Sequence, residues 1–207
     1  MSLQRQDWFE GYRLFALLAA VLLALSLWLA GIRHFDGDGV RMVVRFTART
    51  SLLLFCLAFS AAALARLRPN GWTRWQRRNR RALGLAFAAS HGIHAVAIVA
   101  FAMMDRAGFV AATSLASYVF GGIGYGVIAA MTVTSFDRTA AALGPRNWRA
   151  LHLFGGYYLL LQFAVSFGMR IPAMPLYSLF LIPLFAVLAL RLFAMRAHHS
   201  PHPAELA

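Results

Sequence analysis

Six long apolar stretches, separated by short polar and basic segments, fill most of this 207-residue chain. A helix of about 20 apolar residues crosses the hydrocarbon core of a bilayer. The pattern therefore predicts an all-α integral membrane protein in which a single domain forms a six-transmembrane-helix bundle. The expected spans are about 14–32, 43–66, 82–105, 115–136, 148–169 and 175–194, with a loop over 33–41 and a disordered polar tail over 197–207.

The composition agrees with this class and gives the bundle an orientation. With 60% hydrophobic and 13% charged residues, the chain is too apolar for an ordinary soluble domain. The net charge of +13 comes from twenty arginines that cluster between the apolar stretches. They form no aromatic-interleaved basic face, so we expect no nucleic-acid partner. Seven of them lie between the second and third spans without an acid, which predicts that this loop and both termini are cytoplasmic.

Three histidines lie within or near the predicted spans. His91 and His94, three residues apart in the third span, project from roughly the same helix face. An ionisable group at this depth is a functional hypothesis by default, and neutral imidazole is a good axial ligand for haem iron. A hydrogen-bonded core histidine is the alternative for His91. His152, near the inner end of the fifth span, is a candidate ligand, propionate partner or interfacial histidine.

The depths of His94 and His152 in the membrane argue against a simple pair of axial ligands to one haem. His94 follows Arg81 by 13 residues, or about 20 Å of helix, whereas His152 follows Arg149 by three, or about 5 Å. The fifth-span residue nearest in depth to His94 is Val165, which cannot bind a metal. The sequence has no Cys-x-x-Cys-His motif, so any haem would be held non-covalently.

Two further patterns inside the spans have a functional and a structural explanation. Arg45 and Arg49 lie four residues apart on one face of the second span. They either extend toward the headgroups or bind an anionic group such as a haem propionate. Gly122 and Gly126 in the fourth span make a small-xxx-small face, for which close helix packing is the expected role.

Two longer stretches carry a resemblance to a known family. VRFTARTSLLLFCLAFSAAALARL is followed by RRALGLAFAASHGIHAV, and TSFDRTAAALGPRNWRALHLFGGYY comes later. Together they resemble the ferric reductase-like transmembrane domain, and most closely the haem-binding membrane subunit of the periplasmic methionine-sulfoxide reductase system. The resemblance covers roughly residues 45–165. The positions that match the family's later pattern are Thr134, Ser135, Gly144, Trp148, Leu151 and His152.

The resemblance implies a b-type cytochrome of the bacterial inner membrane, with one haem b or two. It would relay electrons from quinol or a cytoplasmic flavoprotein to a periplasmic redox partner. His94 and His152 would be the metal ligands, and Arg80 would face the cofactor. The family's second fifth-helix histidine is replaced by Val165, and Arg80 stands where many ferric reductases carry another histidine.

These two departures leave several hypotheses open. His91 would supply a missing ligand, a haem would be five-coordinate or take an unusual sixth ligand, or the cofactor has been lost. The alternative function is a haem-free six-helix membrane protein that acts as a partner subunit, a scaffold or a small-solute carrier. A di-haem quinol-type cytochrome with unrelated wiring is a third possibility.

Overall fold

A computed structural model of the chain, which describes residues 9–199, confirms the all-α membrane architecture. Six of its helices are long and apolar enough to cross a bilayer. They are α1 (Gly11–Gly31), α2 (Gly37–Leu67), α4 (Arg80–Met104), α6 (Leu115–Val133), α8 (Pro145–Gly168) and α9 (Leu181–His199), the last preceded by the 3-10 helix η1 (Pro175–Phe180). Three short helices connect them: α3 (Gly71–Arg78), α5 (Arg106–Ala112) and α7 (Asp137–Leu143). The protein is thus a multi-pass membrane protein.

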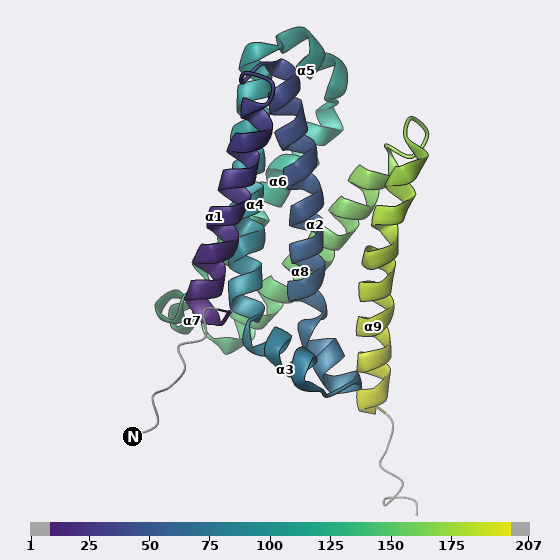
Figure 1. Ribbon diagram of the computed structural model, residues 1–207. Coiled ribbons are helices and arrows are strands. Elements are labelled where there is room, and N and C mark those ends of the chain that lie inside the picture. Colours follow the sequence, from purple (N-terminus) through teal and green to yellow (C-terminus); the bar gives the residue numbers. More distant parts are fainter. Residues whose placement is uncertain (1–8, 200–207) are drawn as a thin grey trace, which may run out of the picture.

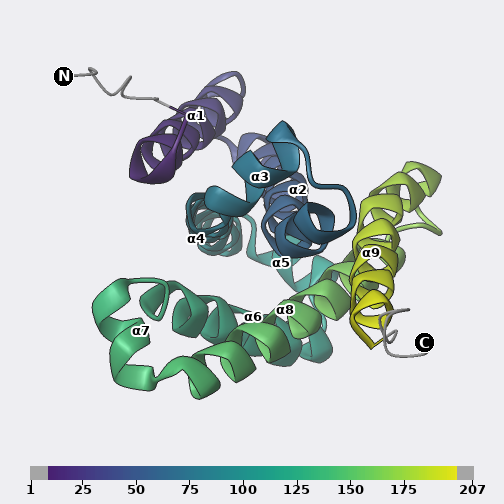
Figure 2. The same ribbon diagram turned by 90° about the horizontal axis from the view of Figure 1, so that it is seen from below.

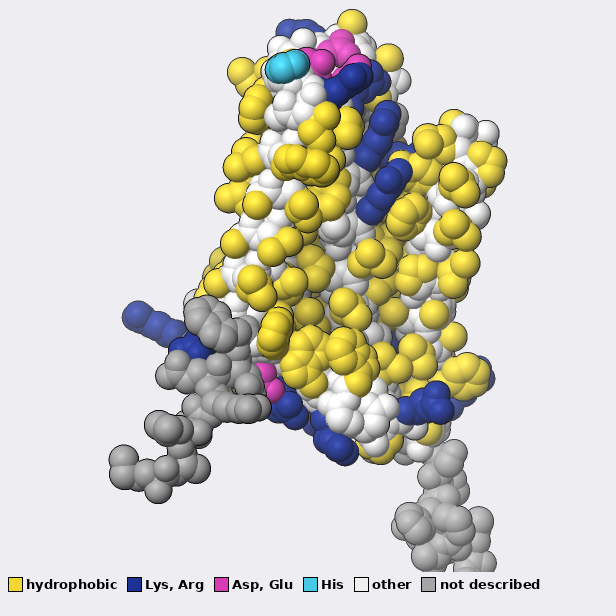
Figure 3. Space-filling view, in the orientation of Figure 1, with side chains coloured by type: hydrophobic (Ala, Val, Ile, Leu, Met, Phe, Trp, Pro, Cys, Tyr) yellow, Lys and Arg dark blue, Asp and Glu magenta, His cyan; other side chains and the backbone are white. Residues whose placement is uncertain are grey.

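The long helices pack in two groups with one helix at the edge. Figure 2 shows α1, α2 and α4 together, the α6–α8 pair along one side of them, and α9 beside α2. The start of α1, the end of α9 and the basic helix α3 lie at the same end of the bundle (Figure 1). Basic side chains lie at this end below an apolar belt, and others lie near the opposite end beside the acidic side chains (Figure 3). The acid-free cluster of seven arginines between α2 and α4 is at the α3 end. By the positive-inside rule we call it the inner end, and the opposite end the outer end.

Several predicted boundaries move when local capping is taken into account. The expected loop over 33–41 is largely helical, because Asp36 accepts a hydrogen bond from the Gly39 amide at 2.7 Å and starts α2 at Gly37. The basic segment between the second and third spans forms α3. At the other end of the chain, α9 continues to His199, so residues 197–199 are helical rather than part of a tail. The rest of the predicted tail, 200–207, lies outside the described residues.

Buried hydroxyl groups join α2 to α4. Thr47, Ser51 and Ser90 have no exposed surface. The Ser90 hydroxyl lies 2.9 Å from that of Ser51 and 3.0 Å from that of Thr50, and it donates to the Thr47 carbonyl at 3.3 Å. Within a membrane, an apolar side chain gains little by moving from lipid to a neighbouring helix. Hydroxyl hydrogen bonds of this kind therefore help to hold the helices together. This hydroxyl seam also sets the position of His94, one turn beyond Ser90.

The glycines that allow close helix packing are not the pair expected from the sequence. Gly122 and Gly126 have open space where a Cβ atom would be, so the predicted small-xxx-small contact is wrong within this chain. Close contact occurs instead at α8. A Cβ atom on Gly155 would meet the Met131 sulfur at 2.4 Å, and one on Gly156 would meet the Phe59 ring at 2.2 Å. These two positions bring α8 against α6 and α2.

Arginine side chains attach the edge helix α9 and η1 to the rest. Arg49 of α2 donates to the Tyr177 hydroxyl at 3.5 Å, and Arg66 donates to the Ala194 carbonyl at 3.1 Å. In the opposite direction, Arg191 donates to the Phe59 carbonyl at 3.0 Å and lies 3.9 Å over the Phe59 ring. We call Arg49, Arg66 and Arg191 the arginine latches.

Candidate functional site

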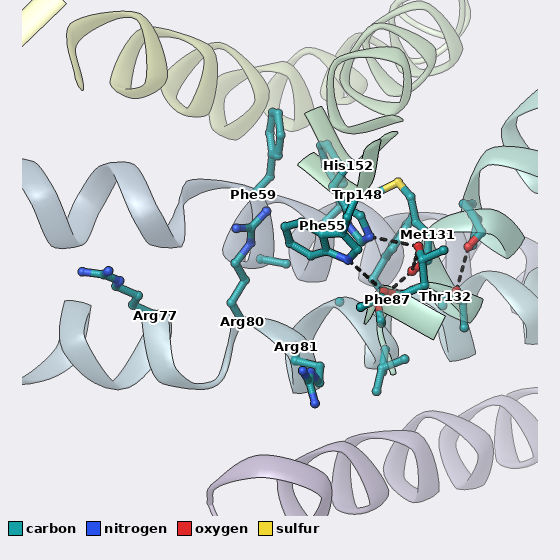
Figure 4. A pocket seen from close by; sticks show the side chains of 18 of the residues that line it. Phe55, Phe59, Arg77, Arg80, Arg81, Phe87, Met131, Thr132, Trp148 and His152 are labelled. Atoms are coloured by element: carbon teal, nitrogen blue, oxygen red, sulfur yellow. Dashed lines mark hydrogen bonds between the residues drawn. The ribbon is translucent and has the colours of Figure 1, made fainter. Parts of the chain in front are cut away.

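A cavity of about 340 Å³ opens near the inner end of the bundle, between α2, α4, α6 and α8. Its size is in the range of cofactor and small-molecule sites. Figure 4 shows aromatic side chains, arginines and one histidine around it. We call it the inner cavity. Its lining comprises Phe55, Ala58, Phe59, Arg77, Arg78, Arg80, Arg81, Gly84, Leu85, Phe87, Ala88, Ile128, Met131, Thr132, Thr134, Ser135, Ala140, Trp148 and His152.

The walls of the inner cavity are apolar and well packed. Phe55, Phe59 and Phe87 are each at most 6% exposed. The Phe55 ring lies 5.2 Å from that of Phe59 and 5.7 Å from that of Phe87. Contacts on both sides leave these rings little freedom to turn, so the walls suit a flat apolar body.

The mouth of the cavity carries an excess of positive charge. Arg78 forms an ion pair with Glu10 at 2.9 Å, and Arg81 forms one with Asp137 of α7. The hydrogen bond from Arg81 holds the pKa of the Asp137 carboxyl below its ordinary value. No carboxylate of the described residues pairs with Arg77 or Arg80. Because Arg80 is half-buried, its charge favours an anionic partner.

His152 is the one imidazole among the described residues that line the cavity. Its Nε2 lies 3.2 Å from the Thr134 hydroxyl, which itself donates to the Ala130 carbonyl at 2.7 Å. The hydroxyl hydrogen is therefore committed, and we assign the proton to Nε2 of His152 and the free lone pair to Nδ1. The Trp148 ring stacks on the imidazole at 4.2 Å, and its Nε1 donates to the Thr134 carbonyl at 2.8 Å. Three residues of the predicted motif thus meet at one wall.

His94 has a different hydrogen-bonding arrangement on the α2 side of α4. Its Nδ1 lies 2.9 Å from the Thr47 hydroxyl, which donates to the Val43 carbonyl at 2.7 Å. By the same reasoning the Nδ1 proton points to Thr47, and Nε2 keeps a free lone pair. A hydrogen bond that fixes the tautomer and orientation of the imidazole is also a feature of metal-binding histidines, whose usual partner is a carboxylate, a backbone carbonyl or water rather than a threonine. The described residues contain no group of three or more His, Cys, Asp or Glu side chains that would hold a metal ion by themselves.

His91 lies between His94 and the neighbouring helices. Its ring centroid is 5.2 Å from that of His94, 5.1 Å from that of Tyr125 and 6.0 Å from that of Phe163. Both its Nδ1 atom and the Tyr125 hydroxyl are buried without a hydrogen-bond partner among the described residues. The hydrogen-bonded core histidine expected as one alternative is therefore not found, since one nitrogen of His91 lacks a partner.

The predicted site residues fall into three separate places. His152 and Arg80 line the inner cavity, and His91 and His94 lie farther along α4. Arg49 instead contacts η1, with its guanidinium 5.5 Å from both the Tyr177 and Phe180 rings. Arg45, one turn away on the same face of α2, is exposed. Of the residues around the inner cavity, sequence analysis missed Arg77, Arg81 and the phenylalanines.

Position 165 does not complete a histidine pair. Val165 is 50% exposed on the surface of α8, whereas Phe163 and Phe167 of the same helix are at most 6% exposed. A ligand at Val165 would therefore point away from the packed interior. The spacing of Arg80, Gly84 and Phe87 along α4 is the signal that could have located the cavity wall, because these positions recur at the 3-4 period of one helix face.

The fold and the site define a multi-pass helical membrane protein with a basic, aromatic-walled cavity near one membrane surface. No protein-family model, curated protein or solved structure matches the chain in sequence or structure comparisons.

Proposed function

We propose that this protein is a b-type cytochrome of the bacterial inner membrane that passes electrons from one membrane surface to the other. The observation that carries the proposal is the inner cavity, which combines flat aromatic walls, one imidazole and arginines without carboxylate partners. A haem has the same three features in complementary form: a flat apolar ring, an iron that binds imidazole, and two carboxylates.

Each group of the cavity has a specific task in this proposal. His152 supplies the imidazole, and the Thr134 hydroxyl and the Trp148 ring fix its orientation. Arg80, which lines the inner cavity alone and pairs with no carboxylate of the described residues, neutralises one of the two carboxylates. The donor set fits a haem that the protein ligates with one histidine rather than two. When bound, haem supplies a centre that accepts and releases a single electron.

His94 is the second candidate ligand, farther from the inner surface. Thr47 holds its Nδ1 proton and leaves Nε2 available. Phe87, which lines the inner cavity, lies 5.5 Å from the His91 ring, and Phe163 lies 6.2 Å from Phe87 and 6.0 Å from His91, so aromatic rings connect the cavity wall to the His91–His94 pair. A second haem, if one is bound, would be held here, and His91 would be its nearest additional imidazole.

The donor and the acceptor in this proposal are those that the resemblance implies: quinol in the membrane or a cytoplasmic flavoprotein as the donor, and a periplasmic redox partner as the acceptor. The opening of the cavity near the basic inner end supports a donor on that side. The resemblance of the Trp148 to His152 motif and of the His94 region to the ferric reductase-like domain supports the same direction of transfer.

Absorption spectra of the detergent-purified protein test the proposal. Oxidised and dithionite-reduced spectra, with pyridine haemochrome quantitation, would be recorded for wild type, His152→Ala, His94→Ala and His34→Ala. His34 lies in the outer turn between α1 and α2, so His34→Ala is the matched control. We expect a reduced α-band that His152→Ala removes and His34→Ala retains. The absence of a Soret band in protein made with ample haem would overturn the proposal.

The replacement of two family histidines favours a second candidate, a haem-free partner subunit or small-solute carrier. Arg80 and the outward-facing Val165 are the observations behind it. In that case the cavity would take another anionic molecule, and all four proteins above would lack the Soret band.

A further inference from the structure

Helix α3 is a short surface helix fixed firmly to the inner end of the bundle (Figures 1 and 2). Asn70 and Thr73 form a capping box at its start. Gln76, only 1% exposed, donates to the Leu57 carbonyl at 2.8 Å and to the Ser60 hydroxyl at 3.1 Å. Because buried side-chain hydrogen bonds tie α3 to α2, the exposed side of α3, which faces away from the bundle, presents its residues in a defined arrangement.

The exposed side of α3 carries an arginine-lined recess. Ala65, Pro69, Arg74, Arg77 and Arg78 line a shallow pocket between the end of α2 and α3. Arg78 already has Glu10 as its partner. Arg74 and Arg77 are exposed and pair with no carboxylate of the described residues, and the sequence contains no acid between positions 39 and 104. The recess therefore presents two guanidinium groups for one external anion.

Two tryptophans show at which level of the membrane this recess lies. Trp72 is 61% exposed and stacks on Trp75 with ring centroids 4.8 Å apart. Trp75 is held in turn by a hydrogen bond from its Nε1 to the Phe9 carbonyl at 3.0 Å. A rigid, exposed tryptophan beside the end of an apolar belt is typical of the headgroup region. By helical spacing, Arg74 projects from the side of α3 opposite Trp72.

We propose that the recess binds the phosphate of an anionic phospholipid from the inner leaflet, with phosphatidylglycerol as the probe. Arg74 and Arg77 bind the phosphate oxygens, as paired guanidinium groups do, and Trp72 lies at the level of the glycerol and ester groups. Only Arg74 and Arg77 of the recess lack a carboxylate partner among the described residues, and an exposed tryptophan adjoins it; this favours a lipid over a nucleic acid or an acidic protein, which would need an extended basic face. The site is separate from the inner cavity except for Arg77, which borders both.

Native mass spectrometry of the full-length protein in detergent, titrated with phosphatidylglycerol or phosphatidylcholine, tests this site without requiring haem. Arg74→Gln is the test variant, because Arg74 touches only the recess. Arg138→Gln on α7 removes the same charge from an exposed side chain at the same end of the bundle, and Arg106→Gln removes one at the outer end. Circular dichroism checks that each variant keeps its helices.

We expect wild type, Arg138→Gln and Arg106→Gln to retain phosphatidylglycerol in preference to phosphatidylcholine. Arg74→Gln should bind it about tenfold more weakly, the value of one charge-assisted hydrogen-bonded contact. Equal binding by Arg74→Gln and wild type would overturn the proposal. An equal loss in Arg138→Gln would also overturn it, because diffuse surface charge would then account for the binding.

Discussion

Substitution of Gly156 by alanine should destabilise the bundle far more than its chemical size suggests. The added methyl group would lie 2.2 Å from Cε2 and 2.8 Å from Cδ2 of the Phe59 ring. That ring cannot turn away easily. Phe55 stacks on it at 5.2 Å, Tyr157 meets it edge-on at 5.4 Å, and the Arg191 guanidinium lies over it at 3.9 Å. Either α8 moves away from α2 or several side chains shift together.

Overpacking of this kind costs about 2 kcal/mol, which is roughly a thirtyfold change in the folding equilibrium. Gly126→Ala is the matched control, since its Cβ atom meets nothing within 4 Å. Alanine there should be neutral or stabilising by about 0.5 kcal/mol through helix propensity. The free energy of unfolding would be measured by circular dichroism in mixed micelles with increasing sodium dodecyl sulfate.

A double variant tests whether contact with the Phe59 ring causes the loss of stability. Phe59→Leu removes the ring that the methyl group would strike, so Phe59→Leu combined with Gly156→Ala should show a favourable coupling free energy of about 1 kcal/mol. If Gly156→Ala unfolds at the same detergent fraction as Gly126→Ala, or if the coupling is zero, the proposed contact between α8 and α2 is refuted.

Three further predictions concern the hydroxyl seam, the imidazole at its end and the inner surface. Ser90→Ala should lower the unfolding free energy by about 1 kcal/mol in the same assay, and an unchanged value would contradict the role of the seam. Thr47→Val removes the acceptor for His94; under the proposed function it should weaken haem retention at that site about tenfold, measured by haemochrome after gel filtration. Asp137→Asn should remove part of the pH dependence of the free energy of unfolding. Arg81 lowers the pKa of the Asp137 carboxyl in the folded protein. The ion pair therefore stabilises the folded state fully above the unfolded pKa of about 3.9, and this stabilisation is lost as the pH falls through the lower folded pKa. Unfolding curves at pH 7 and pH 3 should therefore differ less for Asp137→Asn than for wild type, and an equal difference would contradict the pairing.

The helical spans were predictable because the length of an apolar stretch is a local property of the sequence. The beginning of α2 was misplaced because one capping contact, Asp36 to Gly39, decides it. The glycine contacts were predicted on the wrong helix for a different reason. Gly122-x-x-x-Gly126 and Gly155-Gly156 look equally capable of close approach, and only the arrangement of helices in space selects the second pair.

Which residues share a helix within the candidate site was largely predictable, but which helices come together around it was not. His91 and His94 were correctly placed on one helix, because spacing within a helix follows from the sequence, whereas Arg80 was expected in the preceding basic segment and is the first residue of α4. The sequence suggested that Arg49 and the histidines serve one cofactor, but Arg49 faces η1 on the other side of α2. Which face of α2 meets which neighbour depends on contacts between distant helices, and no local pattern encodes that.

The arginine latches also have a consequence for how the protein is made. Arg49 and Arg66 enter the membrane early, whereas their partners Tyr177 and Ala194 are synthesised 128 residues later in each case. A nascent chain with five inserted helices therefore holds two arginines whose acceptors do not yet exist. For Arg49, which lies inside the α2 span, this is a costly state. Arrival of the last helix satisfies both cations, and its own Arg191 finds the Phe59 carbonyl in the same step. The order of synthesis thus makes docking of η1 and α9 the event that gives these arginines their partners, and a chaperone or protease that recognises unpaired intramembrane charge could distinguish molecules before and after this step.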